Sequence, residues 1–442
     1  MTLIKLLGPA IVIATSLLVL ASESSTPASV PPSVSGASNS REWLALFGLA
    51  LDELDQMRDG SALAAHEQEV LWKVLYAVRR MYVPRRRPAT SLERGAGEFP
   101  GRGREPSNFP RGGLVRLDGR LRAISVEKIH ESLAPRFNIE QFFRCEIESR
   151  SSRQDDGGHG EIVIVYALRV PRQWLAATPH NEPVSCYGFW LKDELIPPAP
   201  APVPVFAAYR VAWHPDVELG RLGMDVGLFD ETKNRTAIGP LDRECFYSLL
   251  AAVGRASPDD WTRISQSASR DIVPLFNQPE TQQGRLISLE GRARRALRLP
   301  VEDRDIVERF GIREYYELEV FTDDSQGNPL VCCVRELPPD MPIGSGIDEH
   351  VRVAGFFYKV WAYRRDATDD DDSTRGTVRQ LAPLLVGRSA TRIAPAPPER
   401  NVAAGAIAAV LFVMAMAGIW WGAWASGRSD GRVRETAPPS AP

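Results

Sequence analysis

The segment Leu114-Val-Arg-Leu-Asp-Gly-Arg120 recurs further along the chain as Leu286-Ile-Ser-Leu-Glu-Gly-Arg292. Two more matches follow in the same order, namely Phe142 to Ile147 with Tyr315 to Val320, and Val184 to Lys192 with Val351 to Lys359. The members of each match stand about 170 residues apart, and a near-constant separation indicates a duplicated domain rather than chance likeness. The sequence therefore predicts two copies of one folding unit.

A helix is predicted ahead of each copy. Glu69 to Val78 resembles Glu244 to Val253, and the first of these stretches has apolar residues at helical spacing. Before it, Ser40 can cap an earlier helix that ends at Asp59-Gly60. We expect a helical hairpin over 41–82 and a helical segment over 241–283. The repeating unit is then a helix, a loop and a β-rich module.

Each module contains five predicted strands, supported by alternating apolar residues and bounded by Gly or Pro. In the first copy they are Gly113 to Arg122, Gln141 to Glu148, Glu161 to Val170, Pro183 to Lys192 and Val203 to Trp213, with a helical turn at Gln173 to Ala177. In the second copy they are about 285–294, 314–322, 329–337, 350–361 and 381–388.

This order places a helix or loop between strands three and four, and a glycine stands inside strand four at Gly188 and Gly355. The arrangement resembles the OB-fold, a small Greek-key barrel in which mid-strand glycines allow sharp coiling. The resemblance implies OB-like domains over 111–213 and 284–390, joined by a linker over 214–240. The predicted fold class is α+β: two tandem small five-stranded OB-like β-barrels, each preceded by helix, plus one C-terminal transmembrane helix.

Apolar segments stand at both ends of the chain. Residues 1–21 have the length of a signal peptide, and an uncleaved anchor is the alternative. Residues 402–425 carry no charge and are long enough to cross a ~30 Å hydrocarbon layer. The other segments are predicted to be a disordered linker over 22–40, an Arg/Pro/Gly-rich linker over 83–110, a Pro/Ala linker over 391–401 and a cytoplasmic tail over 426–442.

Export of the body past the first segment orients the chain. We expect a single-pass cell-membrane protein, anchored through Val402 to Ala425, with its bulk outside the cytoplasm and its C-terminal tail inside. Trp420, Trp421 and Trp424 gather at one end of this helix, as in an interfacial belt. A G-x-x-x-G match at Gly418 and Gly422 lets two helices approach closely, so a homodimer through this pair is an open alternative.

The cysteines, histidines and short motifs nominate no reaction. Four of the five cysteines align with an aliphatic residue in the other copy, which favours small buried hydrophobes over disulfides. The six histidines lack ligand spacing, and no nucleophile elbow, P-loop or His-Glu-x-x-His is present. Asp369 to Asp372 could gather calcium but lacks alternating ligand spacing, so a solvated loop is favoured. We expect a protein that is not an enzyme, with no cofactor and no metal site.

Charge is concentrated locally, although the net charge of the chain is only −3. The segment Arg79 to Arg122 has twelve arginines against four acidic residues and includes Arg85, Arg86 and Arg87. Such a segment could bind a polyanion, meaning nucleic acid, anionic lipid or acidic glycan, and a solvated linker is the alternative.

Equivalent charged positions in the two copies give further candidate binding residues, namely Arg120 with Arg292 and Lys192 with Lys359. A cross-strand ion pair in each barrel is the favoured role for them. The outward face of strand two carries Glu146 and Glu148 in the first copy, and Glu317 and Glu319 in the second. An acidic face repels phosphate and argues against nucleic acid as a partner.

These features predict a non-enzymatic, membrane-anchored envelope protein. Its duplicated extracytoplasmic domains would bind another envelope protein or polymer, because linked copies raise the effective concentration at a partner with two sites. The alternative is a membrane-tethered polyanion binder that acts through Arg79 to Arg122.

Overall fold

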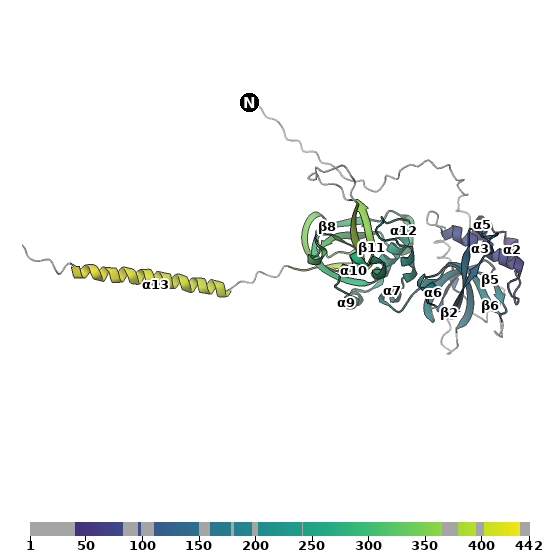
Figure 1. The fold of residues 1–442 in the computed structure, drawn as a ribbon, viewed down its shortest axis with the longest axis horizontal. Helices are drawn as coiled ribbons and strands as arrows, with labels where there is room; N and C mark the ends of the chain where they lie inside the picture. Colours follow the sequence, from purple (N-terminus) through teal and green to yellow (C-terminus); the bar gives the residue numbers. More distant parts are fainter. Residues whose placement is uncertain are drawn as a thin grey trace, which may run out of the picture. The chain divides into compact units, whose positions relative to one another are not determined.

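The computed structural model describes residues 40–82, 96–98, 110–149, 160–177, 181–196, 202–240, 242–364, 379–394 and 402–433. The chain forms two compact units, whose elements are labelled in Figure 1. Unit 1 comprises Met1–Leu117, Ile124–Arg169 and Cys186–Arg210, and unit 2 comprises Asp118–Ala123, Val170–Ser185 and Val211–Pro442. The predictions for the N-terminal segment, for Arg85, Arg86 and Arg87, and for Asp369 to Asp372 lie outside the described residues.

Three helices begin unit 1: α1 (Ser40–Leu46), α2 (Leu51–Asp55) and α3 (Ala65–Tyr82). The single helix predicted between Arg41 and Asp59 is therefore wrong, since the chain breaks at Gly48, whose φ of 96° is left-handed. The apolar stripe predicted on the following helix is confirmed. Its five residues are all buried, namely Val70, Leu71, Val74, Leu75 and Val78.

The first sheet has seven strands in the order β1-β2-β3-β4-β6-β5-β7, and β2 also pairs with β5. Strands β4 and β6 are parallel, whereas β3 with β4 and β5 with β6 are antiparallel. Two short helices, α5 (Ala134–Phe137) and α6 (Gln173–Ala176), lie between strands. The strands are β1 (Gly97–Glu98), β2 (Leu114–Lys128), β3 (Gln141–Ser149), β4 (Glu161–Arg169), β5 (Glu182–Glu194), β6 (Val203–Arg210) and β7 (Ala212–Trp213).

Unit 2 contains a closed five-stranded barrel in the order β10-β12-β11-β8-β9, in which β10 and β12 are parallel. Its strands are β8 (Leu286–Pro300), β9 (Glu314–Phe321), β10 (Leu330–Glu336), β11 (Gly344–Arg364) and β12 (Arg379–Arg392). Its helices are α7 (Glu218–Arg221), η4 (Val226–Glu231), α8 (Asp242–Arg255), α9 (Pro258–Gln266), α10 (Val273–Asn277), α11 (Pro279–Gln282), α12 (Arg304–Phe310) and η5 (Asp323–Ser325). The mixed α+β class is thus confirmed.

The stretch over 214–240, expected to be a linker, is instead part of a hydrophobic core. It contains α7 and η4, and its Leu219, Met224 and Leu228 are buried in a cluster with residues of α8. These helices are too short for hydrophobic periodicity to reveal them in the sequence, which is why the stretch was expected to be a linker.

The barrel of unit 2 is packed on both sides of its wall. Leu318 and Cys332 belong to one buried cluster, whereas Cys333 and Leu384 belong to a second cluster that includes α8. Successive residues of a strand point to opposite faces, so β10 is apolar at every position from Leu330 to Val334. In unit 1, Phe142 and Tyr166 are likewise buried with α3. The strand-two face expected to be open is therefore covered in part, since Phe142 is only 6% exposed.

Gly188 and Gly355 lie in similar surroundings. A Cβ atom on Gly188 would lie 3.0 Å from the Cβ of Phe206, and one on Gly355 would lie 3.2 Å from the Cβ of Leu385. Phe206 belongs to β6, the fifth strand counted from β2, and Leu385 belongs to β12, the fifth strand counted from β8. Both glycines thus allow a neighbouring strand to approach closely, as expected of mid-strand glycines in a small barrel.

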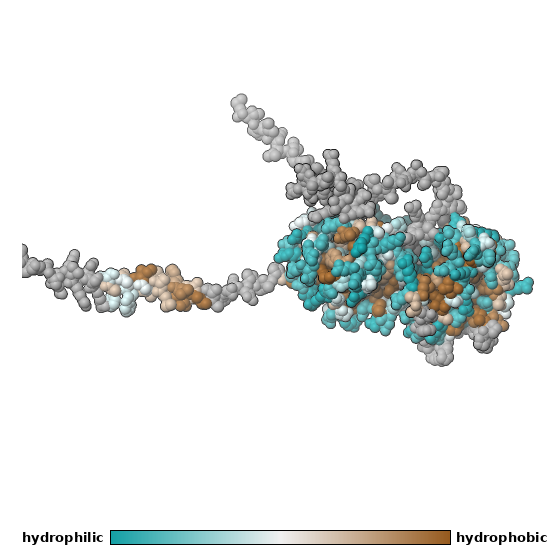
Figure 2. Space-filling view, in the orientation of Figure 1, coloured by the Kyte–Doolittle hydropathy of each residue, from teal (hydrophilic) through white to brown (hydrophobic). Residues whose placement is uncertain are grey.

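The last element is α13 (Val402–Val433), whose apolar residues between Ala406 and Ser426 are exposed. Figure 2 shows hydrophobic side chains along it. The stretch Ala406–Ser426 is long and apolar enough to cross a membrane.

Candidate functional site

Each predicted binding residue that the structure describes contacts a different partner. Arg120 donates to the carbonyl oxygen of Asn181 at 2.8 Å, and Arg292 pairs with Asp348 at 2.8 Å in an exposed contact. Lys192 and Lys359 are fully buried, so they face no solvent-borne ligand. Arg85, Arg86 and Arg87 lie outside the described residues.

Lys192 is held by a helix rather than by a strand. Its Nζ donates to Glu67 Oε2 at 2.8 Å, and Glu67 lies in the first turn of α3. The same carboxylate accepts the backbone N–H groups of Arg58 at 2.7 Å and Ala64 at 2.9 Å. The cross-strand ion pair expected for Lys192 is therefore wrong, because the carboxylate comes from the element that covers the sheet.

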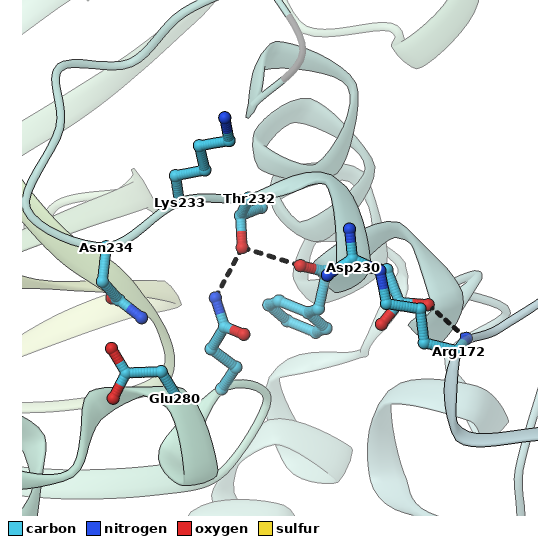
Figure 3. Close-up of a pocket in the computed structure, with 8 residues that line it drawn as sticks. Arg172, Asp230, Thr232, Lys233, Asn234 and Glu280 are labelled. Atoms are coloured by element: carbon cyan, nitrogen blue, oxygen red, sulfur yellow. Dashed lines mark hydrogen bonds between the residues drawn. The ribbon is translucent and has the colours of Figure 1, made fainter. Parts of the chain in front are cut away.

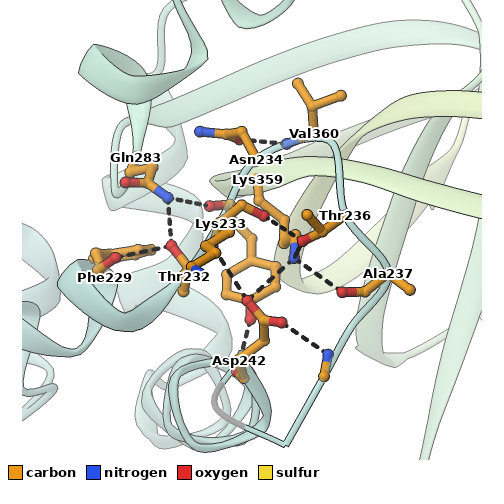
Figure 4. A network of polar contacts seen from close by, with 12 residues as sticks. Phe229, Thr232, Lys233, Asn234, Thr236, Ala237, Asp242, Gln283, Lys359 and Val360 are labelled. Carbon is orange, nitrogen blue, oxygen red and sulfur yellow. Dashed lines mark hydrogen bonds and ion pairs between the residues drawn. The ribbon is translucent and has the colours of Figure 1, made fainter.

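Lys359 is held in the same way. Its Nζ donates to Asp242 Oδ1 at 3.1 Å and to Thr236 Oγ1 at 3.0 Å, and Asp242 begins α8 (Figure 4). Asp242 also accepts the backbone N–H groups of Gly239 at 2.7 Å and Lys233 at 3.3 Å. The cross-strand prediction is wrong here for the same reason.

We call the two arrangements the first clasp (residues 58–67 with Lys192) and the second clasp (residues 233–242 with Lys359). In both, the carboxylate accepts N–H groups from residues three and nine positions earlier in the chain. In both, the loop also pairs with the residue after the lysine. Asp59 accepts the N–H of Asp193 at 2.8 Å, and Asn234 accepts the N–H of Val360 at 2.8 Å.

The backbone of the clasps matches too. The N–H of Gly60 donates to Asp193 O at 2.8 Å, and the N–H of Arg235 donates to Val360 O at 2.7 Å. Both donors have left-handed backbones, with φ of 75° at Gly60 and 59° at Arg235. Each clasp thus ties a loop and a helix start to the fourth strand of its sheet.

Burial sets the electrostatics of the clasps. For Glu67, burial alone would raise the pKa, but the hydrogen bonds from Lys192 and the backbone outweigh it and hold the pKa below its ordinary value. For Lys359, burial lowers the pKa although Asp242 opposes the shift. Because both ammonium groups are sealed from solvent, the clasps hold the fold and offer no reacting group.

A polar cavity of about 410 Å³ lies beside the second clasp in unit 2 (Figure 3). It is lined by Arg172, Phe229, Asp230, Thr232, Lys233, Asn234, Glu280 and Gln283. Lys233 and Asn234 belong to the clasp loop, so the buried ion pair and the cavity share one piece of backbone. This cavity is the candidate functional site.

Hydrogen bonds fix much of the cavity wall. Thr232 Oγ1 donates to Phe229 O at 2.8 Å and accepts from Gln283 Nε2, and Asp230 Oδ2 accepts the backbone N–H of Arg172 at 2.7 Å. Asn234 is held through its Oδ1, as described for the clasp. The wall is therefore largely preorganised.

A serine and a histidine also meet in unit 2. Ser185 Oγ lies 2.8 Å from His214 Nε2, and His214 Nδ1 lies 2.9 Å from the carbonyl oxygen of Met224. Since a carbonyl oxygen only accepts, the His214 Nδ1–H donates to it, which leaves Nε2 for the contact with the Ser185 hydroxyl. Ser185 pairs with Ala212 inside the sheet and not at the strand-to-helix turn that exposes a catalytic serine, so we assign it no reaction.

Strand β8 carries four arginines (Arg292, Arg294, Arg295 and Arg298), and three of them pair with carboxylates. Arg295 pairs with Glu319 at 2.6 Å, and Arg298 pairs with Glu314. Arg294 lies over the ring of Phe321, 4.9 Å from its centroid. A surface of paired charges has little of the net positive potential that attracts a polyanion.

Sequence reasoning missed Glu67, Asp242 and the cavity. The two carboxylates precede the matched residues Glu69 and Glu244 by two positions, so extending that match would have found them. The cavity residues come from separate loops and short helices, and no motif in the sequence links them.

Comparisons with known proteins assign the chain to no family. No protein-family model matches the chain, and no curated protein matches it. Two solved structures of the single-stranded DNA binding protein from Thermus aquaticus match 65% of this chain with a TM-score of 0.16. The wild type is 8% identical and covered over 95% of its length, and a deletion mutant is 9% identical and covered over 97%. Similarity this low carries no argument about fold or ligand.

Proposed function

We propose that this chain is a membrane-anchored binding protein without catalytic activity, whose duplicated units bind another envelope protein or polymer. The observation that supports it best is the recurrence of the clasp. The same backbone donors, carboxylate and buried lysine occur in both units at matching positions. Both copies keep the same clasp, and the lysine of each clasp is buried and cannot react with a substrate. This arrangement fits paired binding modules better than an enzyme.

The proposal includes two OB-like domains. If the strands of each copy are numbered in chain order, both sheets follow the order 1-2-3-5-4 with strands three and five parallel. In the first copy the pairing of β2 with β5 joins the two ends of this order. That connectivity is the one expected of a Greek-key barrel of OB type.

The proposal places the body outside the cytoplasm, with α13 as the anchor and the tail inside. Protease treatment of intact cells, compared with spheroplasts, tests it. A tag after residue 442 should survive in both samples, whereas the body should be cleaved only when the protease can reach the outer side of the membrane. Cleavage of the tag with the body intact would show that the chain has the opposite orientation.

Binding is tested by crosslinking in living cells, followed by solubilisation and capture of the full chain. We expect a specific envelope protein or envelope polymer to be recovered with the chain. Recovery of cytoplasmic proteins alone, or of nothing above an unrelated single-pass control, would contradict the proposal.

The polyanion alternative depends on the segment Arg79 to Arg122, which includes Arg85, Arg86 and Arg87. Described arginines of the same segment already have partners, since Arg111 pairs with Asp59 at 2.7 Å and Arg120 with Asn181. If the alternative is right, deletion of residues 85–87 should abolish heparin binding. The affinity of the intact chain for heparin should fall at least tenfold between 50 mM and 200 mM salt.

A further inference from the structure

We infer that the cavity beside the second clasp binds a neutral sugar ring, which makes a glycan the polymer that this chain recognises. This inference rests on the proposed binding function and adds the class of ligand. It is carried by the hydrogen-bonding groups that the cavity wall leaves unused, by their charge, and by a difference between the two units.

The wall leaves donors and acceptors interspersed. Asn234 uses its Oδ1 on the N–H of Val360, so its amide NH2 remains available as a donor. Gln283 uses its Nε2 on Thr232 and on Tyr358 O, so its Oε1 remains available as an acceptor. Asp230 keeps one carboxylate oxygen after accepting from Arg172.

Charged side chains complete the set. Lys233 and Arg172 supply positive groups, and Glu280 and Asp230 supply negative ones. Figure 3 shows Asn234 and Glu280 on one side of the cavity, and Asp230 and Arg172 on the other. Within the described part of the chain, no ion pair engages the Lys233 ammonium or the Glu280 carboxylate.

This set of groups selects the ligand class. Two cations and two anions balance, so the cavity does not favour a polyanion. A wall with one aromatic ring among polar groups does not suit an apolar ligand. A hydroxyl group both donates and accepts, so a ring bearing several hydroxyls satisfies interspersed donors and acceptors at once. The volume of about 410 Å³ suits a small ligand of one or two such rings.

At the equivalent place, unit 1 has a different pair of residues. Gly112 and Gly284 both have left-handed φ, of 75° and 76°, and both donate to the fourth strand, at Trp190 O and Phe357 O. The preceding residues, Arg111 and Gln283, therefore correspond. In unit 1 the Arg111 guanidinium pairs with Asp59 at 2.7 Å, where unit 2 has Gln283 and Asn234. In unit 1 an ion pair therefore stands where unit 2 has two uncharged polar side chains.

The difference between the units supplies a variant that should fold. The double substitution Asn234→Asp/Gln283→Arg gives unit 2 the residues that unit 1 has at both positions. The new ion pair would occupy part of the cavity and remove the free amide groups of both residues, while the aspartate could still accept the N–H of Val360 as Asp59 accepts that of Asp193. Glu280→Gln, which removes one charge on the rim, is the milder variant.

Binding is measured by saturation-transfer NMR and calorimetry on the full chain in detergent, with maltotriose, cellotriose and chitotriose as probes. We expect at least one probe to bind, at least tenfold weaker binding to Glu280→Gln, and no measurable binding to the double variant. Raising salt from 50 mM to 300 mM should change the affinity less than twofold, because the ligand carries no charge.

Three results would overturn the inference: no binding of any probe, binding that both variants leave unchanged, or a salt dependence above tenfold. Thermal unfolding of each variant separates loss of the site from loss of the fold. The crosslinking experiment is an independent readout. An envelope protein captured equally by the wild type and the double variant would leave the proposed function standing while the sugar site fails.

Discussion

Lys192 and Lys359 show how a charged residue can be essential without touching a ligand. Each is fully buried, and each meets a carboxylate from the first turn of the helix that covers its sheet. Removing one partner of such a pair leaves a buried charge without compensation, which costs more than the intact pair contributes.

Lys192→Met should therefore destabilise unit 1 by about 3–5 kcal/mol. The control is Arg304→Met, because the pair of Arg304 with Glu308 is exposed and should matter by less than about 0.5 kcal/mol. Chemical denaturation measures both. The double variant Glu67→Leu/Lys192→Met should regain much of the loss, and a Lys192→Met variant as stable as the control would show that the first clasp is dispensable.

Glu67 also gives a pH dependence. Its pKa in the folded protein is lowered from 4.5. Between the folded-state pKa and pH 4.5, the unfolded chain therefore binds more protons than the folded one. The stabilisation is present above pH 4.5 and is lost as pH falls through the folded-state pKa. Denaturation between pH 3 and pH 6 should show a shallower acid slope for Glu67→Gln than for the wild type. Equal slopes would contradict the assignment.

At the scale of elements, β10 is buried on both faces, and this explains its adjacent cysteines. Cys332 lies in the cluster inside the barrel, whereas Cys333 lies in the cluster with α8. All five cysteines are buried, and none of them forms a disulfide in the structure. Burial raises the pKa of Cys145 and of Cys332 to about 12. Thiols of this kind are poor nucleophiles at neutral pH.

The native protein should therefore expose no reactive thiol, although it is proposed to face an oxidising compartment. A maleimide reagent at pH 7.5 should label none of the five cysteines in the native chain and all five after denaturation without reductant. Fewer than five labelled thiols in the denatured chain would reveal a disulfide. Rapid labelling of the native chain would contradict the packing described here.

At the scale of the whole molecule, α13 differs from every other described helix in exposing a long apolar surface. Ile419, Trp420 and Trp421 are each more than two-thirds exposed. Burying such a surface in lipid stabilises it, whereas water does not. Outside α13, most of the large apolar residues that the structure describes are instead gathered in buried clusters.

The full chain should stay in the membrane fraction after alkaline carbonate extraction, whereas a chain that ends at residue 401 should be released. A charge-bearing variant, Met414→Arg, tests the same helix without truncation and should lower the membrane-bound fraction. Release of the full chain by carbonate would remove α13 as an anchor.

The sequence alone predicted the order of strands, the helix ahead of each sheet and the apolar C-terminal segment. These features depend on local periodicity and on composition, both of which can be read directly from the amino-acid sequence. The prediction of two copies remains a prediction, although the matching clasps support it. Cys332 and Cys333 lie in different buried clusters, as the alternation of side chains along a strand requires.

Only the tertiary structure decided what the candidate residues do. Glu67 and Lys192 are separated by 125 positions, and Asp242 and Lys359 by 117, so no local pattern joins them. Their contact depends on how a loop, a helix start and a strand pack together. The cavity has the same origin, since its wall combines the clasp loop with Glu280 and Gln283. Local sequence determines which elements form, whereas burial and long-range packing determine which charged groups are sealed and which remain able to bind.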